Sequence, residues 1–255
     1  MKKLLSSLAV CTVTLVANPV KAELNLGLDS APYPPFYEAD SSGKFVGWEI
    51  EIGEAICAAM EEKCNWVAVA WDGIIPALLA KKIDAIVGSM SITEERMRTI
   101  AFSDKYYNTP AAIVALKSST IDGSPESVAG LIIGVQVATT HQNYVQTYFQ
   151  DTADSIKTYQ DFNEHNQDLF AGRIDAVVGD SLAMGDFLNS AEGEVFEIKA
   201  SLQDDAIFGP GVGVGLRKED TELRERINSA IGQIREDGTY EEISARYFDF
   251  NIYGD

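Results

Sequence analysis

Apolar and polar positions follow two alternating patterns along the chain beyond residue 22. Short apolar or alternating runs favour strands, and stretches in which apolar residues recur every three or four positions favour helices. Residues 50–60 show the helical pattern, because Ile52, Ile56 and Met60 would share one face. The patterns predict strands at residues 24–28, 66–69, 83–87, 131–136, 155–158, 174–179, 194–198 and 211–216, and helices at 50–60, 74–81, 93–98, 139–148, 163–171, 181–189, 221–237 and 240–247.

This alternation of strands and helices predicts an α/β fold with largely parallel sheets. Two segments have similar sequences: Lys-Ile-Asp-Ala-Ile-Val-Gly at residues 82–88 and Arg-Ile-Asp-Ala-Val-Val-Gly at residues 173–179. The repeat favours two similar α/β lobes, and chance likeness between short helix-to-strand joints is the alternative. Ligands of such sheets bind beyond the carboxyl ends of the strands, where we therefore look for chemistry.

Residues 1–22 have the three parts of a secretory signal peptide. Two lysines precede an apolar run over residues 4–17, and a small-residue cleavage site ends at Ala22. The apolar run is too short and too mixed to span a bilayer. We therefore predict a soluble, exported, periplasmic protein; an uncleaved anchor and, because of Cys11, a lipoprotein are the alternatives.

Composition and charge restrict the classes of partner. Hydrophobic residues make up 46% and charged residues 23% of the chain, as in ordinary globular proteins. The formal net charge of −19 argues against binding to nucleic acid or to an anionic membrane. Cationic or zwitterionic small ligands and protein partners remain compatible with it.

Two cysteines remain after the expected cleavage, Cys57 and Cys64. A close, even pair in an exported protein favours a disulfide bond between the end of one helix and the next strand. A zinc site would need further ligands, and the two histidines, His141 and His165, lie far along the chain. We therefore expect a structural disulfide and neither a metal nor a cofactor.

Two motifs in the first half of the chain match a known pattern. Residues 47–52 read Gly-Trp-Glu-Ile-Glu-Ile. Residues 71–78, Trp-Asp-Gly-Ile-Ile-Pro-Ala-Leu, are followed at residues 89–96 by Ser-Met-Ser-Ile-Thr-Glu-Glu-Arg. Both motifs resemble those of the periplasmic solute-binding proteins of polar amino-acid ABC importers (family 3), although Trp48 stands where that family more often has Phe or Tyr.

The second half of the chain carries a third motif of the same family. Gly-Val-Gln at residues 134–136 precedes Thr139 and Thr140, and Ala-Gly-Arg-Ile-Asp at residues 171–175 leads to Asp180. The resemblance covers nearly all of the chain after residue 22. It is strongest to the lysine/arginine/ornithine/histidine branch and to the octopine/nopaline branch.

The resemblance implies a type II periplasmic-binding-protein fold, in which a two-strand hinge joins two α/β lobes. Lobe one would comprise residues 23–109 plus 204–255, and lobe two residues 110–203. Hinge closure would trap a basic amino acid (arginine, lysine, ornithine or histidine) or an arginine-derived opine. A monomeric protein would then deliver that ligand to an ABC permease in the inner membrane.

Two other functions are compatible with this fold. A cyclohexadienyl-dehydratase-like enzyme would need a positioned acid or base, and the sequence shows no nucleophile–base arrangement. A ligand sensor for a membrane receptor would act through a partner protein. We expect a binding protein rather than an enzyme.

By resemblance, three residues would hold the backbone groups of the ligand. Arg96 would grip the carboxylate through two parallel hydrogen bonds, and Thr140 would add donors from lobe two. Asp180 would accept from the α-ammonium group. Ser89 and Ser91 would line the cleft beside them.

The same resemblance places other residues around the ligand side chain. Tyr33 and Trp71 would sandwich it, with a favourable cation–π contact at Trp71. Asp29 would pair with a distal positive charge, but one extra residue between Gly27 and Tyr33 leaves either Asp29 or Ser30 at that position.

Two departures from the family bear on the choice of ligand. His141 stands where the family often has Gln, and it either contacts the ligand or is only the second residue of a capped helix. Gly88 stands where relatives that bind lysine or histidine often carry Ser. The missing side chain favours arginine or a larger derivative such as octopine, unless Gly88 merely relieves crowding in a strand.

Overall fold

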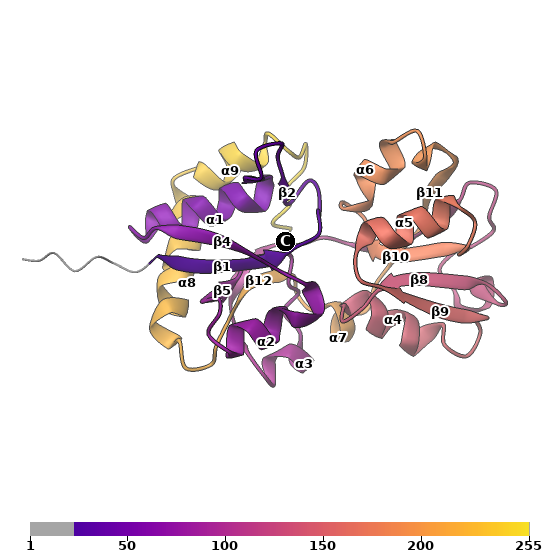
Figure 1. Cartoon of the computed structure of the whole chain (residues 1–255), viewed down its shortest axis with the longest axis horizontal. Coiled ribbons are helices and arrows are strands. Elements are labelled where there is room, and N and C mark those ends of the chain that lie inside the picture. Colours follow the sequence, from indigo (N-terminus) through magenta and orange to yellow (C-terminus); the bar gives the residue numbers. More distant parts are fainter. Residues whose placement is uncertain (1–22, 255) are drawn as a thin grey trace, which may run out of the picture.

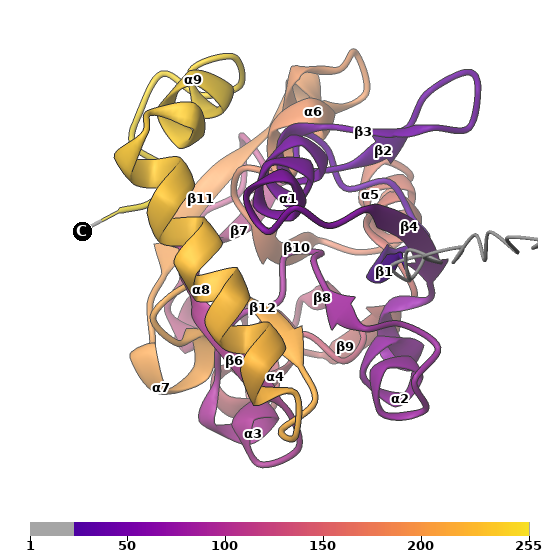
Figure 2. The same cartoon turned by 90° about the vertical axis from the view of Figure 1, so that its left-hand side faces the viewer.

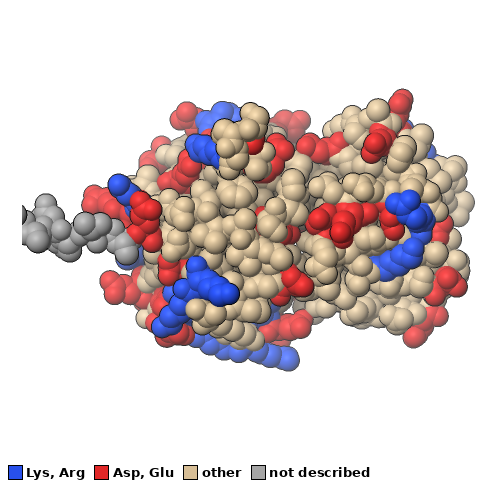
Figure 3. All heavy atoms as spheres, in the orientation of Figure 1, with Lys and Arg blue, Asp and Glu red and all other residues tan. Residues whose placement is uncertain are grey.

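The computed structural model describes residues 23–254 as two α/β lobes that lie side by side (Figure 1). The expected signal peptide over residues 1–22, with Cys11, lies outside the described residues. Among the described residues, none of the helices is long and apolar enough to cross a membrane. On the face shown in Figure 3, acidic side chains occur over both lobes, in keeping with the net charge of −19.

The sheet of lobe one has the strand order β4-β1-β5-β12-β6. β1 pairs in parallel with β4 and β5, whereas β12 is antiparallel to both β5 and β6. A short antiparallel ribbon, β2–β3, belongs to the same lobe. The strands are β1 (Leu24–Asp29), β2 (Glu38–Ala39), β3 (Phe45–Val46), β4 (Cys64–Val69), β5 (Ala85–Ile86), β6 (Ala101–Tyr107) and β12 (Val212–Leu216).

Helices cover both faces of this sheet. α1 and α8 pack against each other, and α2 packs against β1 and β5 (Figure 2). Successive residues of a strand point to opposite faces; Ala85 packs into the apolar cluster of α1 and α8, and Ile86 into that of α2. The helices are α1 (Trp48–Ala59), α2 (Ile74–Leu79), α3 (Glu94–Met97), α8 (Thr221–Glu236) and α9 (Thr239–Ser244).

The sheet of lobe two has the order β11-β7-β10-β8-β9 and is built on the same plan. Val177 and Val178 are consecutive residues of β10; Val177 packs into the cluster that holds Phe162 of α5, and Val178 into the cluster that holds Tyr144 of α4. The elements are β7 (Ala111–Leu116), β8 (Ile132–Gln136), α4 (Thr140–Tyr148), β9 (Ser155–Tyr159), α5 (Phe162–Phe170), β10 (Ala176–Asp180), α6 (Met184–Asn189) and β11 (Phe196–Leu202).

The prediction of largely parallel sheets is wrong for half of each sheet. In lobe two, β7 is antiparallel to both β10 and β11. The sequence patterns also missed β6 and β7 entirely, and extended the predicted strand at residues 83–87 beyond the two residues of β5. Periodicity shows which residues are buried but carries no information about strand direction.

The chain crosses between the lobes twice. Residues 108–110 join β6 to β7, and residues 203–211 join β11 to β12 and include α7 (Asp205–Phe208). Gly209 has φ +74°, and a Cβ at this position would lie 1.8 Å from the carbonyl oxygen of Ile92. Only glycine therefore allows the second crossing to approach lobe one this closely.

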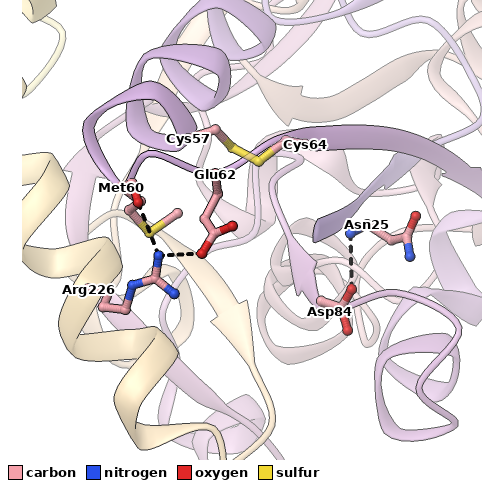
Figure 4. The surroundings of a disulfide bond; sticks show 7 residues. All are labelled: Asn25, Cys57, Met60, Glu62, Cys64, Asp84 and Arg226. Atoms are coloured by element: carbon pink, nitrogen blue, oxygen red, sulfur yellow. Dashed lines mark hydrogen bonds and ion pairs between the residues drawn. A yellow bond between two sulfur atoms is a disulfide. The ribbon is translucent and has the colours of Figure 1, made fainter. Parts of the chain in front are cut away.

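The disulfide expected from the cysteine pair is confirmed. Cys57, near the end of α1, is bonded to Cys64 at the start of β4 (Figure 4). Arg226 of α8 holds the intervening turn, donating to the carbonyl of Met60 at 3.1 Å and to Glu62 at 2.6 Å. The disulfide therefore fastens α1 to β4, and Arg226 attaches α8 to the turn between them.

We expect replacement of Cys57 and Cys64 by serine to lower the free energy of unfolding by at most roughly 2–3 kcal/mol, because the closed loop is short. Urea denaturation with and without reductant measures this. The disulfide is about 17 Å from Asp29, because Cys64 pairs with Leu24 and Asp29 lies five residues further along β1. A double variant that loses clearly more than about 3 kcal/mol would contradict the prediction.

Candidate functional site

A cavity lies where the carboxyl ends of strands from both lobes meet. Asp29 ends β1, Gln136 ends β8 and Asp180 ends β10. The cavity is lined by Asp29, Tyr33, Tyr37, Trp71, Gly88, Ser89, Ser91, Arg96, Gln136, Thr139, Thr140, His141 and Asp180.

The cavity brings together the residues that the family resemblance indicated, except for Ser30, the alternative to Asp29. Among the described residues, Asp29 lines it, whereas Ser30 is exposed and is not part of the lining. Sequence reasoning missed Tyr37 as a lining residue, and it assigned no role to Gln136, although Gln136 lies in the motif at residues 134–136. The position of Gln136 at the end of a buried strand was a signal for it, whereas Tyr37 lies in a loop with no local pattern.

Arg96, which is half-buried, supplies the cavity with a guanidinium group. Thr93 caps α3 by accepting from the backbone N–H of Arg96 at 3.2 Å, and the guanidinium donates to the carbonyl of Ser91 at 3.0 Å. Burial lowers the pKa of Arg96 to about 10, so it is a cation at neutral pH. Within residues 23–254, no ion pair joins Arg96 to a carboxylate. The cavity therefore presents a cation with hydrogen-bonding capacity left for an anionic group.

Asp180 is held from both lobes. Tyr33 of lobe one donates its hydroxyl proton to Asp180, and His141 Nε2 of lobe two lies 3.4 Å from Asp180 Oδ1. Burial and the neighbouring Asp180 raise the pKa of Tyr33 well above its usual value, so Tyr33 remains a donor. His141 both lines the cavity and occupies the second position of α4. This arrangement leaves Asp180 as a fixed acceptor at the junction of the lobes.

Asp29 forms a second buried carboxylate site, and it is 5% exposed. Gln136 Nε2 of lobe two donates to Asp29 Oδ2 at 3.1 Å, and the backbone N–H of Ala31 donates at 3.3 Å. Burial raises the pKa of Asp29 despite these two hydrogen bonds. A cation in the cavity would favour the ionised form of this side chain.

The backbone carbonyl of Ala138 joins the two lobes at the rim of the cavity. It accepts from Trp71 Nε1 at 3.1 Å and from Arg96 Nη2 at 3.4 Å. Trp71 lies in a short 3₁₀ turn (Trp71–Gly73), and the guanidinium carbon of Arg96 is 5.6 Å from its ring centroid. Ala138 has φ +58°, which turns the chain into the cap of α4 at Thr139. These contacts describe a closed arrangement of the lobes.

One contact between the lobes lies outside the cavity. Asn143 Nδ2 of α4 donates to Glu95 Oε2 of α3 at 2.8 Å. Neither residue lines the cavity, so this hydrogen bond affects closure without touching an occupant.

Comparison with known proteins identifies relatives over nearly the full length. The family model of the bacterial extracellular solute-binding proteins, family 3, matches residues 24–250. The lysine/arginine/ornithine-binding periplasmic protein of Escherichia coli (strain K12) is 41% identical over 234 residues, which cover 91% of this chain and 90% of that protein. The L-arginine-binding protein of Pseudomonas aeruginosa is 38% identical over 258 residues, covering 100% of this chain and 99% of that protein.

A solved structure agrees with these sequence matches. An ancestral arginine-binding protein bound to arginine superposes with a TM-score of 0.82 at 34% identity, covering 89% of this chain and 98% of that one. The fold class expected from the sequence, a type II periplasmic-binding-protein fold, is confirmed by this likeness.

We expect Asn143→Ala to shift the ligand-free protein from the closed towards the open form by roughly two- to tenfold, because one exposed hydrogen bond to a charged group is lost. Distances between spin labels, one on each lobe, measure the two populations. Asn189→Ala, an exposed asparagine at the end of α6, is the matched control. Equal populations in the two variants would show that the contact plays no part in closure.

Proposed function

Because the chain belongs to the bacterial extracellular solute-binding proteins, family 3, we propose that it binds a basic amino acid or an arginine-derived opine outside the cytoplasm. The ligand occupies the cavity between the lobes, and the closed protein delivers it to an ABC permease. Arginine is the ligand we favour, in line with the names of the Pseudomonas aeruginosa relative and of the ancestral structure.

The charge pattern of the cavity is the observation that carries this proposal. The lining contains one guanidinium, Arg96, and two carboxylates, Asp29 and Asp180. A basic α-amino acid carries one carboxylate and two cationic groups, which is the complementary set. Buried charges need partners. A ligand of this kind provides a partner for each charged group of the cavity, whereas a neutral amino acid would leave one carboxylate unpaired.

Each end of the ligand then has its own partners. Arg96 binds the α-carboxylate from lobe one, with Ser91 beside it, and Thr140 at the start of α4 adds donors from lobe two. Asp180 accepts from the α-ammonium group. These partners come from both lobes, so closure completes the binding of the α-carbon groups.

The ligand side chain extends towards Asp29. Asp29 rather than Ser30 pairs with the distal cation, because Asp29 is the residue that faces the cavity. Trp71 and Tyr33 flank the path, and a guanidinium stacks favourably on an aromatic face. Gly88 lines the cavity, and a Cβ there would lie 3.1 Å from Leu28 Cα, so a side chain at this position would be crowded against β1.

The ligand drives closure by touching both lobes. A ligand shifts a conformational equilibrium only by its differential affinity for the two states. Its partners in lobe one, such as Arg96, remain available in the open form, whereas those in lobe two, such as Asp180, approach only on closure. Hinge closure around a ligand is a recognised mode of domain motion.

The names of the relatives support a proposal for where in the cell the protein acts. The Escherichia coli relative is named a periplasmic protein, which supports a periplasmic location for this chain. Action as a monomer with a permease in the inner membrane is part of the same proposal. The relatives reported above are binding proteins, which supports binding without turnover over a dehydratase activity.

We expect arginine, lysine, ornithine, histidine or octopine to raise the melting temperature, with a stabilisation that follows RT ln(1 + [L]/Kd), about 2.7 kcal/mol at 100 times Kd. A thermal-shift panel with these compounds, glutamine, citrulline and glutamate measures this. Stabilisation by neutral or acidic compounds alone would contradict the ligand class, and no stabilisation would contradict amino-acid binding. Turnover of prephenate or arogenate would instead support the enzyme.

A matched pair of variants separates the two carboxylates. Asp180→Asn should weaken all amino-acid ligands by roughly ten- to hundredfold, because each one has an α-ammonium group. Asp29→Asn should weaken arginine and lysine by a similar factor and leave citrulline unchanged. Titration calorimetry measures both. A uniform loss in Asp29→Asn would show that Asp29 does not recognise the ligand side chain.

A further inference from the structure

Glu49 is a fully buried carboxylate that lies behind the cavity without lining it. It occupies the second position of α1. Its Oε1 accepts from the backbone N–H of Ser89 at 2.9 Å, its Oε2 accepts from the Ser89 hydroxyl at 2.9 Å, and Tyr106 also donates to it. Two of the three hydrogen bonds therefore fix a single cavity-lining residue.

Ser89 needs such a support. It lines the cavity with φ +58°, a backbone conformation that residues other than glycine rarely adopt. Tyr107 donates to the Ser89 hydroxyl at 2.6 Å, which leaves that hydroxyl to donate its own proton to Glu49. Loss of the Glu49 acceptors would leave the backbone N–H and the hydroxyl of Ser89 without these partners, and the side chain could then rotate.

No ion pair joins Glu49 to a cation within residues 23–254. The groups that act on it are Tyr106 and Ser89, which donate, and the anionic Asp180 at the end of β10. The charge of Glu49 in turn helps to raise the pKa of Tyr33 and Tyr37, in the loop after β1, and of Tyr107 in β6. Burial raises the pKa of Glu49 to about 7.

We propose that Glu49 is a positioning residue of the binding site: its carboxylate form holds Ser89 against the cavity, and a cationic ligand bound there favours that form and releases the proton. The inference rests on the proposed function, because it needs a cationic ligand.

The direction of the pH dependence follows from this linkage. Below about pH 7 the free protein carries the proton on Glu49, and the ligand must displace it. Affinity therefore increases with pH, by at most tenfold for each pH unit, and levels off above pH 7. Near pH 7 a fraction of one proton leaves the protein for each ligand bound.

Titration calorimetry with arginine tests this, in buffers of different ionisation enthalpy between pH 6 and pH 8. We expect proton release from the parent protein, none from Glu49→Gln, and an affinity about tenfold weaker for Glu49→Gln at pH 8. Glu49→Asp should restore proton release. Glu51→Gln is the matched control on the same helix, since Glu51 pairs at the surface with Arg246 and Tyr247 and should leave both values unchanged.

His141→Gln is the second test variant, because His141 lines the cavity and its Nε2 lies 3.4 Å from Asp180 Oδ1. If His141→Gln still releases protons on binding arginine, the assignment of the proton to Glu49 is supported. If it releases none, the inference is overturned. Both outcomes can be read even where Glu49→Gln fails to fold. Arginine binding without proton release overturns this inference alone. The absence of arginine binding at every pH contradicts the proposed function itself.

Discussion

Buried carboxylates outnumber buried cations at the junction of the two lobes, and this imbalance governs the rest of the site. Asp29, Glu49 and Asp180 are all buried. Arg96 is the guanidinium that lines the cavity with Asp29 and Asp180, and Glu49 lies behind it. Taking a carboxylate out of water is costly unless it is hydrogen-bonded or paired. The structure supplies the hydrogen bonds, from Gln136, Ser89, Tyr106 and Tyr33, and leaves the missing positive charge to a ligand.

The two crossings of the chain explain how this imbalance arises only on closure. Each lobe folds around its own sheet, so Asp29 and Asp180 are fixed at strand ends independently of each other. Bringing the lobes together removes both carboxylates from water and forms the Tyr33–Asp180 and Gln136–Asp29 hydrogen bonds. A cationic ligand thus stabilises the closed form in two ways, through its contacts and by neutralising the charge that closure buries.

The same logic links binding affinity to the residues behind the cavity. Ser89 has a strained backbone and reaches the cavity only with the support of Glu49 and Tyr107. Because Ser89 is ordered before a ligand arrives, the free-energy cost of ordering it belongs to folding and not to binding.

The sequence by itself determined most of the helices, the apolar strands other than β6 and β7, and most of the residues of the cavity. The spacing of Leu223, Ile227, Ile231 and Ile234 predicts one apolar face of a helix; the three isoleucines are buried in α8, and Leu223 is half-buried. The motifs of family 3 identified residues that the structure places around one cavity. These inferences succeed because helical periodicity and strand-end motifs are local properties of the chain.

Only the tertiary structure decided the direction of β7 and β12, the use of Gln136 and Tyr37, and the support of Ser89 by Glu49. Asp29 and Gln136 are 107 residues apart, and Tyr33 and Asp180 are 147 apart. A hydrophobic pattern records that a residue is buried but not which distant residue it meets, because that depends on how two sheets and two crossings are arranged in space.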